Sequence, residues 1–200
     1  MAEDLAGYTE VDPNSHITKT SSRVTLSGLT KGEDAYVYKD FGASFFNKID
    51  LMFSGRVSTG TIGEYDVGFT NEIGDASAWW GFDYKEIRIV FRQNYIYFYC
   101  GANSDYYEIS FNTDYYLTLA RAADSDSSTL KIYSDAARSN LLDSMTLSGL
   151  GTGTRYRYFY AASSYNSSES SKTISGYVEN FRFPVASAVA GRAQIIGLPW

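Results

Sequence analysis

Residues that carry covalent and metal chemistry are scarce in this sequence of 200 residues. It contains one cysteine, one histidine and three prolines. A single cysteine excludes an internal disulfide and any zinc site built on several cysteines. So few prolines exclude a collagen-like chain. No run of about 18 apolar residues occurs, so we expect no membrane-spanning helix.

Positively charged residues are also fewer than negatively charged ones. The chain has 17 Lys and Arg against 23 Asp and Glu, which gives a net charge of −6. Phosphate backbones are bound by basic faces, so we do not expect nucleic acid as a partner. The opening residues, MAEDLAG, have neither the basic nor the apolar region of a secretory signal, and we expect no signal peptide.

Aromatic residues are what the sequence has in abundance. They make up 16% of the chain, and 18 of them are tyrosines. Hydrophobic residues reach 44% and charged residues 20%, so the chain has enough apolar surface to build a core. Disorder throughout the chain is therefore excluded.

Short segments with strand character recur along most of the sequence. They are rich in β-branched and aromatic residues and are separated by turns of Gly, Asn, Asp and Ser, such as residues 101–105 and 124–128. One of them is Ser77–Tyr84, and the best helical candidate is the short piece Ser134–Leu142. About thirteen such segments predict an all-β protein built as an antiparallel sandwich or barrel.

Several of these segments resemble one family of sandwiches. These segments are Tyr116–Arg121, Leu130–Asp135, Asn140–Asp143, Arg157–Tyr160 and Gly176–Phe183. They are similar to strands of concanavalin A-like domains, in particular the laminin-G-like jelly rolls of phage and environmental proteins. The resemblance implies a jelly roll of two curved antiparallel sheets. Members of that superfamily bind sugars or proteins, hydrolyse glycans or build particles, so the fold does not select a function.

The last seventeen residues differ from the rest. Pro184 lacks the amide hydrogen that a strand ladder needs, so we expect the jelly-roll domain to comprise residues 1–183 and a C-terminal arm residues 184–200. The arm ends in large apolar side chains, which predict that it folds back on the domain or docks on another chain. These arm residues are Ile195, Ile196, Leu198 and Trp200.

Tyrosines follow the period of two that places side chains on one face of a strand. Tyr95, Tyr97 and Tyr99 alternate with apolar residues that belong in a core, so we expect these tyrosines to face outward or into a groove. Such rows suit packing within the sheet, a protein interface or stacking of sugar rings. A second row and an adjacent Trp pair complete the candidate binding residues: Tyr156, Tyr158, Tyr160, Trp79 and Trp80.

Catalytic groupings are missing from the sequence. Glycoside hydrolysis needs two carboxylates that flank the bond. Glu64 and Asp66 share one face of a predicted strand, but Gly68 occupies the third position. We interpret nearby acids, such as Asp75, as chance placements on a solvated loop. His16 is expected to be structural.

The single cysteine is not expected to react either. Cys100 falls on the apolar side of its predicted strand, which favours a small buried side chain over a nucleophile. We expect no enzymatic activity and no catalytic residues.

Calcium is the one cofactor with a candidate site. Asp124 and Asp126, with the hydroxyls around them, resemble half of a calcium site. The alternative is a solvated hairpin loop, in which Asp and Ser side chains bond their own backbone.

These observations favour a non-enzymatic structural or adhesive protein. We expect it to work through contacts with other protein subunits, including copies of itself, as a capsid-decorating or tail protein of a virus or phage particle, or on an extracellular surface. The alternative is a lectin-like module that binds carbohydrate through its Tyr and Trp side chains. A glycan hydrolase that uses Glu64 and Asp66 is the third hypothesis.

Overall fold

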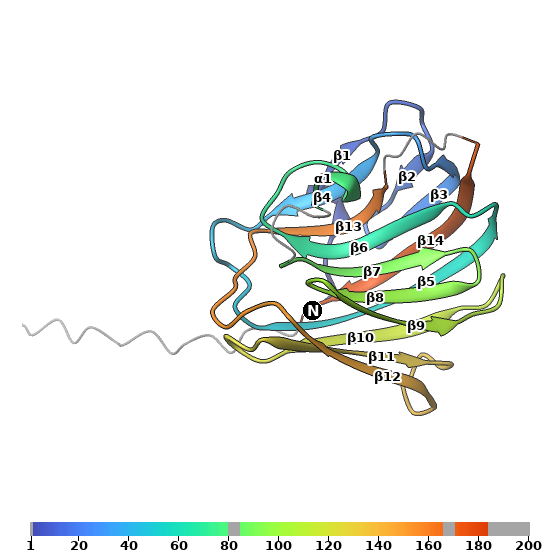
Figure 1. The fold of residues 1–200 in the computed structure, drawn as a ribbon. Coiled ribbons are helices and arrows are strands. Elements are labelled where there is room, and N and C mark those ends of the chain that lie inside the picture. Colours follow the sequence, from blue (N-terminus) through green and yellow to red (C-terminus); the bar gives the residue numbers. More distant parts are fainter. Residues whose placement is uncertain (1, 80–84, 166–170, 184–200) are drawn as a thin grey trace, which may run out of the picture.

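The computed structural model describes residues 2–79, 85–165 and 171–183 of the chain. These residues form two antiparallel sheets of seven strands each, which pack face to face (Figure 1). The predicted all-β sandwich of two antiparallel sheets is therefore confirmed. Within the described ranges, no helix is long and apolar enough to cross a membrane.

We call the sheet nearer the viewer in Figure 1 the front sheet and the other the back sheet. The front sheet contains, in the order of pairing, β1 (Thr9–Val11), β4 (Tyr36–Asp40), β13 (Tyr158–Ser164), β6 (Glu64–Thr70), β7 (Ile87–Arg92), β8 (Tyr95–Cys100) and β9 (Asn103–Glu108). The back sheet contains β12 (Leu141–Ser148), β11 (Ser127–Tyr133), β10 (Tyr115–Arg121), β5 (Ile49–Gly60), β14 (Thr173–Arg182), β3 (Arg23–Thr30) and β2 (Ile17–Lys19). Of two short helices, η1 (Leu5–Gly7) precedes β1, and α1 (Ala76–Trp79) lies between β6 and β7.

The core lies between the sheets because side chains alternate between the two faces of each strand. In β8, Ile96, Phe98 and Cys100 are buried, whereas the tyrosines between them are half-buried on the outer face. Aromatic rings from both sheets meet in the core. Phe53 of β5 and Phe91 of β7, for example, have ring centroids 6.4 Å apart in an edge-on arrangement.

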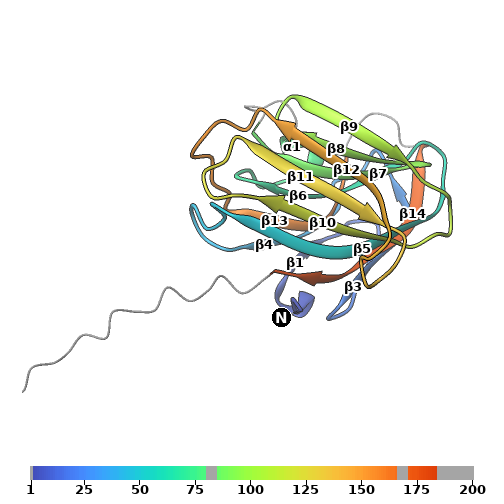
Figure 2. The same ribbon diagram turned by 90° about the horizontal axis from the view of Figure 1, so that it is seen from below.

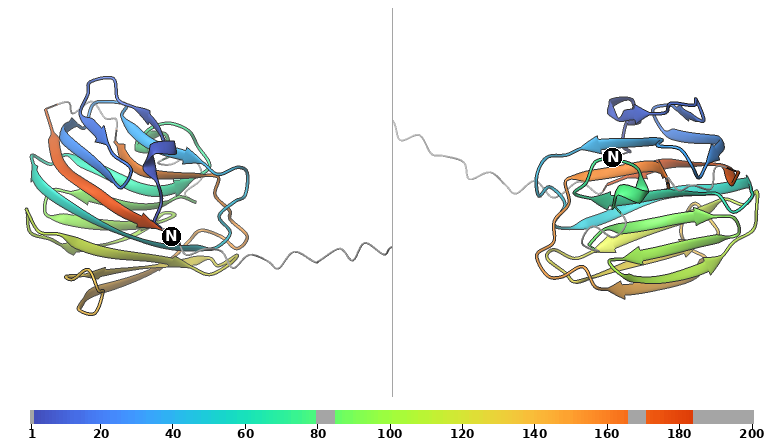
Figure 3. Two further views of the ribbon diagram at one scale, coloured as in Figure 1. Left: turned by 180° about the vertical axis from the view of Figure 1, so that it is seen from behind. Right: turned by 45° about the horizontal axis from the view of Figure 1, so that its top comes forward.

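The segment of residues 71–79, which follows β6, covers part of the outer face of the front sheet (Figure 3). Its helix α1 contributes Ala76 to a second apolar cluster that includes Tyr36, Tyr158 and Tyr160. The Tyr160 hydroxyl accepts a hydrogen bond from the amide of Gly74 at 3.1 Å, which ties the segment to the sheet.

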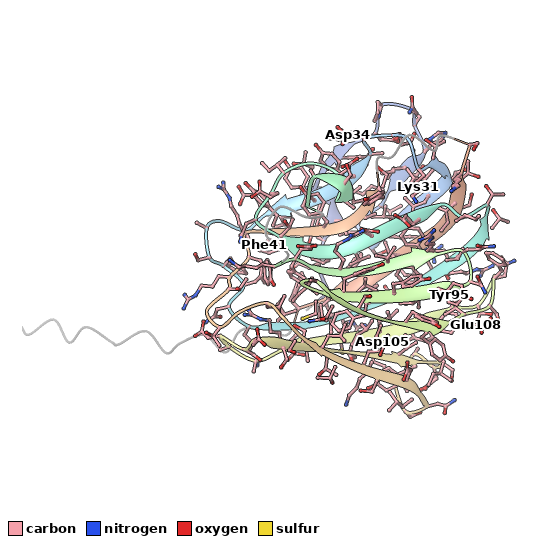
Figure 4. The ribbon with its side chains drawn as sticks, viewed as in Figure 1. Lys31, Asp34, Phe41, Tyr95, Asp105 and Glu108 are labelled. Carbon is pink, nitrogen blue, oxygen red and sulfur yellow. The ribbon has the colours of Figure 1, made fainter. Side chains whose placement is uncertain are left out.

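The strands β9 and β12 form neighbouring edges of the two sheets (Figure 2). β9 pairs with β8 on one side and is the last strand of the front sheet. Most of its side chains are exposed, including Asp105 and Glu108, which are labelled in Figure 4.

The prediction of a helix at Ser134–Leu142 is wrong. These residues form turns and the start of β12. The Asp135 side chain accepts hydrogen bonds from the amide of Asn140 at 2.7 Å and the amide of Ser139 at 3.2 Å. Such local bonds compete with a helix, because they satisfy the backbone in another conformation.

The predicted C-terminal arm, residues 184–200 with Ile195, Ile196, Leu198 and Trp200, lies outside the described residues. The boundary at residue 183 and the role of the arm stay predictions.

Candidate functional site

A pocket of about 190 Å³ opens on the outer face of the front sheet. Its lining combines three tyrosines, three cations, one carboxylate and one valine: Tyr97, Tyr99, Tyr165, Lys31, Arg88, Arg92, Glu64 and Val90. Figure 4 labels Lys31 above β6 and Tyr95 at the start of β8, both toward the same end of the sheet. The pocket therefore occupies the part of this face that α1 leaves uncovered.

Strand register brings most of these side chains together. β6, β7 and β8 pair in sequence, with Glu64 opposite Arg92 and Arg88 opposite Tyr99. Residues opposite each other on neighbouring strands point to the same side of a sheet. Lys31 follows the end of β3 and therefore reaches the pocket from the end of a back-sheet strand.

The carboxylate of Glu64 lies between two cations. Its Oε2 atom is 4.0 Å from the Lys31 Nζ atom and 3.6 Å from the Arg92 Nε atom. The Glu64 and Lys31 side chains are buried, whereas the Arg92 side chain is 37% exposed. Arg92 is therefore the cation of the pocket that solvent reaches most easily.

A closer ion pair lies beneath the pocket. Arg88 donates to the Asp66 Oδ2 atom from Nε at 2.7 Å, and its Nη2 atom is 2.5 Å from the same oxygen. Both side chains are almost completely buried. Burial raises the pKa of the Asp66 carboxyl to about 7, with a smaller contribution from Glu64, while Arg88 acts in the opposite direction.

Aromatic rings hold the Arg88 guanidinium from two directions. Its central carbon is 5.2 Å from the ring centroid of Tyr99 and 5.6 Å from that of Tyr165. The Lys31 Nζ atom is 5.5 Å from the same Tyr165 ring. Cation–π contacts of this kind stabilise cations that are partly removed from water.

A row of tyrosines leads from the pocket to the edge of the sheet. Tyr97 and Tyr99 are stacked with centroids 6.2 Å apart, and Tyr95 lies 5.7 Å from Tyr97. Tyr106 of β9 extends the row, with centroids 5.5 Å from Tyr97 and 5.4 Å from Tyr95. Because Tyr106 is 57% exposed, the row presents ring surface to solvent outside the pocket.

The structure places the two predicted tyrosine rows differently. Tyr95, Tyr97 and Tyr99 lie on the outer face, as the alternation predicts. The prediction that Tyr156 shares a face with Tyr158 and Tyr160 is wrong. Tyr156 precedes β13, lies in the main core and donates a hydrogen bond to the Lys85 carbonyl at 2.6 Å; the other two are buried in the cluster beneath α1.

The Trp pair does not lie on the predicted strand. The segment Ser77–Tyr84 was expected to be extended, but Trp79 is the last residue of α1. Trp80 lies outside the described residues. The alternation argument, which put the two indoles on opposite sides of a strand, therefore does not apply, and their role as ligand candidates stays a prediction.

The candidate calcium ligands are engaged in loop contacts. The Asp126 Oδ1 atom accepts a hydrogen bond from the amide of Gly151 at 2.6 Å, and the Asp124 Oδ1 atom is 3.4 Å from the Arg155 Nη2 atom. Among the residues that the structure describes, no three acidic, histidine or cysteine side chains come together as metal ligands. These contacts fit the hairpin-loop alternative.

The structure also places His16, Cys100 and Asp75, which the sequence analysis considered for catalysis. The His16 Nδ1 atom is 2.8 Å from the Glu33 Oε2 atom, and His16 is not among the residues that line the pocket. Cys100 is buried, as predicted. Asp75 is buried and its Oδ1 atom accepts from the amide of Ser77 at 3.0 Å, so the reading of this acid as part of a solvated loop is wrong.

Sequence reasoning missed the cations and one tyrosine of the pocket. Arg88 and Arg92 alternate with the buried Ile87, Ile89 and Phe91, and this signal places both arginines on the outer face. The loop positions of Lys31 and Tyr165 carry no such signal.

No protein-family model and no curated protein matches the chain, whereas solved structures do. One is the legume lectin-like domain from Entamoeba histolytica, with a TM-score of 0.58, 12% identity and coverage of 92% of this chain and 96% of that one. Another is the exoplasmic/lumenal domain of VIP36 in its Ca2+/Man2-bound form, with a TM-score of 0.51, 13% identity and coverage of 86% and 80%.

A third similar structure is a protein of unknown function from Shewanella oneidensis MR-1, with a TM-score of 0.51, 11% identity and coverage of 90% and 74%. Identities this low concern the fold and not the activity. With two antiparallel seven-stranded sheets and a legume lectin-like domain among its structural neighbours, the chain has the concanavalin A-like jelly-roll fold.

Proposed function

We propose that this protein is a lectin-like module that binds carbohydrate, without hydrolysing it, in the pocket on the outer face of the front sheet. The observation that carries the proposal is the lining of the pocket, which joins tyrosine rings to charged hydrogen-bonding groups. Sugar recognition needs both, because the C–H face of a sugar packs on an aromatic ring while its hydroxyls require donors and acceptors.

The lining supplies each of these groups on neighbouring strands. Tyr97 and Tyr99 offer ring surface and phenol hydroxyls. Glu64 supplies acceptor oxygens and Arg92 supplies donors at the most exposed side of the pocket. The fold of the lectin-like neighbours supports the proposal as an analogy of architecture.

The described acids of the pocket support binding rather than hydrolysis. A glycosidase needs one carboxyl as proton donor and a second as nucleophile or base, both facing the scissile bond. Asp66 is enclosed and bonded to Arg88, so Glu64 is the acid that lines the pocket among the residues that the structure describes. A single acid of this kind supports a binding site without catalysis.

Calcium does not fit this pocket. Calcium sites gather several oxygen ligands, mostly carboxylates, whereas the lining sets three cations beside Glu64. We therefore expect binding to persist in the presence of a chelator. The known Ca2+/Man2-bound form belongs to VIP36 and does not set the requirement of this chain.

Glycan binding by the full-length protein tests the proposal. A glycan array followed by calorimetry should identify a saccharide ligand, and Tyr97→Ala should weaken its binding by tenfold or more. Tyr116→Ala is the matched control, because Tyr116 is half-buried on the outer face of the back sheet, opposite Tyr133. Absence of any glycan ligand, or equal loss in both variants, would contradict the proposal.

The particle-assembly hypothesis remains a separate prediction. It depends on the arm at residues 184–200, which lies outside the described residues. Light scattering of the full chain and of a chain ending at Phe183 tests it, because only the full chain should assemble.

A further inference from the structure

The row of tyrosines on the outer face of the front sheet extends beyond the pocket. Tyr97 lines the pocket, and Tyr106 of β9 lies directly opposite it in the strand pairing. Tyr95 precedes Tyr97 by two residues on β8, so both side chains point to the same side of the sheet. Neither Tyr95 nor Tyr106 lines the pocket itself. The row therefore adds ring surface that a ligand confined to the pocket would not touch.

The rings of the row contact one another. The ring centroid of Tyr106 is 5.5 Å from that of Tyr97 and 5.4 Å from that of Tyr95. The centroids of Tyr95 and Tyr97 are 5.7 Å apart. Such contacts hold each ring in place before a ligand arrives, and a tyrosine side chain has few rotatable bonds to immobilise. Binding to the row therefore costs little conformational entropy.

The row is also open to water. Tyr106 is 57% exposed on the edge strand, and Tyr95 and Tyr97 are half-buried. Scattered single aromatic residues are common on protein surfaces, whereas contiguous exposed rings are typical of contact sites. We therefore treat the three rings as one binding surface that continues from the pocket to β9.

Polar side chains border this surface on both sides. Glu108 of β9 and Arg92 of β7 lie opposite Tyr95 on its two neighbouring strands. Figure 4 labels Tyr95 and Glu108 at the same end of the sheet. Ser104, opposite Tyr99, is exposed like Glu108. Hydrogen-bonding groups beside rings suit a saccharide, in which hydroxyls surround apolar C–H faces, better than a protein partner, whose contact needs a larger apolar centre.

We infer that the ligand is an oligosaccharide chain, with one unit in the pocket against Tyr97 and the next units packed on Tyr95 and Tyr106. The inference rests on the proposed carbohydrate-binding function and names the form of its ligand. Each unit beyond the pocket adds contact with a prearranged ring, and its hydroxyls can bond to Glu108 at the border of the row. A single sugar reaches only the pocket.

Chain length is the variable that tests the inference. Linear oligosaccharides of glucose, mannose and xylose, one to four units long, are titrated into the full-length protein by calorimetry, together with fragments of any glycan that the array identifies. We expect a trisaccharide to bind roughly tenfold or more tightly than its monosaccharide, because it gains two ring contacts. This gain should persist at about 0.5 M salt, which screens exposed charges but not ring packing.

Variants then locate the gain with chain length. Tyr106→Ala and Tyr95→Ala should each remove most of it and leave monosaccharide binding nearly unchanged, whereas Tyr97→Ala should weaken both. Tyr106→Phe keeps the ring and should keep most of the gain. Tyr116→Ala, on the outer face of the back sheet, is again the control. Thermal melts establish that each variant is folded, and the exposed Tyr106 keeps the test valid if the half-buried Tyr95 does not tolerate change.

Each outcome bears on one of the two proposals. Equal affinity for the monosaccharide and the trisaccharide, or a gain that survives both Tyr106→Ala and Tyr95→Ala, overturns the inference and leaves carbohydrate binding standing. A dimer in light scattering that Tyr106→Ala dissociates would assign the row to a contact between copies of the protein and overturn the inference as well. If no saccharide binds, alone or on the array, the proposed function itself fails.

Discussion

Arg88 directs both Nε and Nη2 at one oxygen of Asp66, the Oδ2 atom, at 2.7 and 2.5 Å. The other oxygen, Oδ1, is buried and has no hydrogen-bond partner among the described residues. A carboxylate in this setting is only half satisfied, so burial costs its ionised form more than it costs the neutral acid. This relationship makes Asp66 a group whose protonation changes on folding.

The stability of the protein should therefore fall between pH 4 and pH 7 through Asp66. Its pKa rises from 3.8 to about 7 on folding, so the folded chain holds this proton more tightly. The stabilisation is fully present below about pH 4 and is lost as the pH rises through 7. Urea unfolding across this range measures the unfolding free energy of the wild type and of Asp66→Asn. The value for Asp66→Asn should rise relative to that of the wild type as the pH rises.

Asp105→Asn on the exposed strand β9 is the control for that experiment. The unfolding free energy of Asp105→Asn should depend on pH in the same way as that of the wild type. Parallel profiles for wild type and Asp66→Asn would contradict the assignment.

A methyl group at Gly176 should destabilise the back sheet. A Cβ atom there would lie 2.1 Å from the Arg56 carbonyl oxygen, a backbone atom in the neighbouring strand β5. The strands must move apart to accept it, so we expect Gly176→Ala to cost about 1–3 kcal/mol of unfolding free energy. Gly7→Ala, where nothing lies within 4 Å of the added carbon, should change stability far less.

Removal of the Tyr156 hydroxyl should affect stability and leave ligand binding unchanged. The hydroxyl donates to the Lys85 carbonyl at 2.6 Å from within the core. Tyr156→Phe removes this buried bond, and we expect a loss of about 1–2 kcal/mol in chemical unfolding. Tyr116→Phe on the outer face of the back sheet serves for comparison. A change in glycan affinity in Tyr156→Phe would place this residue back among the binding candidates.

The thiol of Cys100 should be unreactive in the folded protein. Burial raises its pKa to about 11, and it is the only cysteine of the chain, so a thiol reagent reports on one site. We expect alkylation at pH 8 to be slower than in the unfolded chain by a hundredfold or more. Rapid labelling under native conditions would show that the Cys100 region opens.

The sequence predicts those parts of the fold that depend on local alternation. β8 is the best example, because its tyrosines and its Ile, Phe and Cys residues separate to opposite faces as expected. The same rule fails at Tyr156, which precedes β13 and forms an isolated bridge with Phe46. A period of two holds only within a regular strand, and the sequence does not mark where β13 begins.

The contacts around the pocket show the same limit of sequence-based prediction, because they join residues that are far apart in the sequence. The sequence places Glu64 and Asp66 on one face of a strand, which is confirmed. Their partners come from other parts of the chain. Lys31, the partner of Glu64, follows a back-sheet strand, and Arg88, the partner of Asp66, belongs to the next strand of the front sheet. Strand order decides these contacts, and strand order is a tertiary property that no local pattern encodes.

The position of β9 has a consequence for how the protein behaves in concentrated solution. A terminal strand offers unpaired amides and carbonyls on which a strand of another molecule can grow. In β9, which is such a terminal strand, the side chains of Asp105 and Glu108 are exposed carboxylates. Two such edges approaching each other bring like charges together, so at neutral pH this border repels its own copies while the tyrosine row beside it stays accessible.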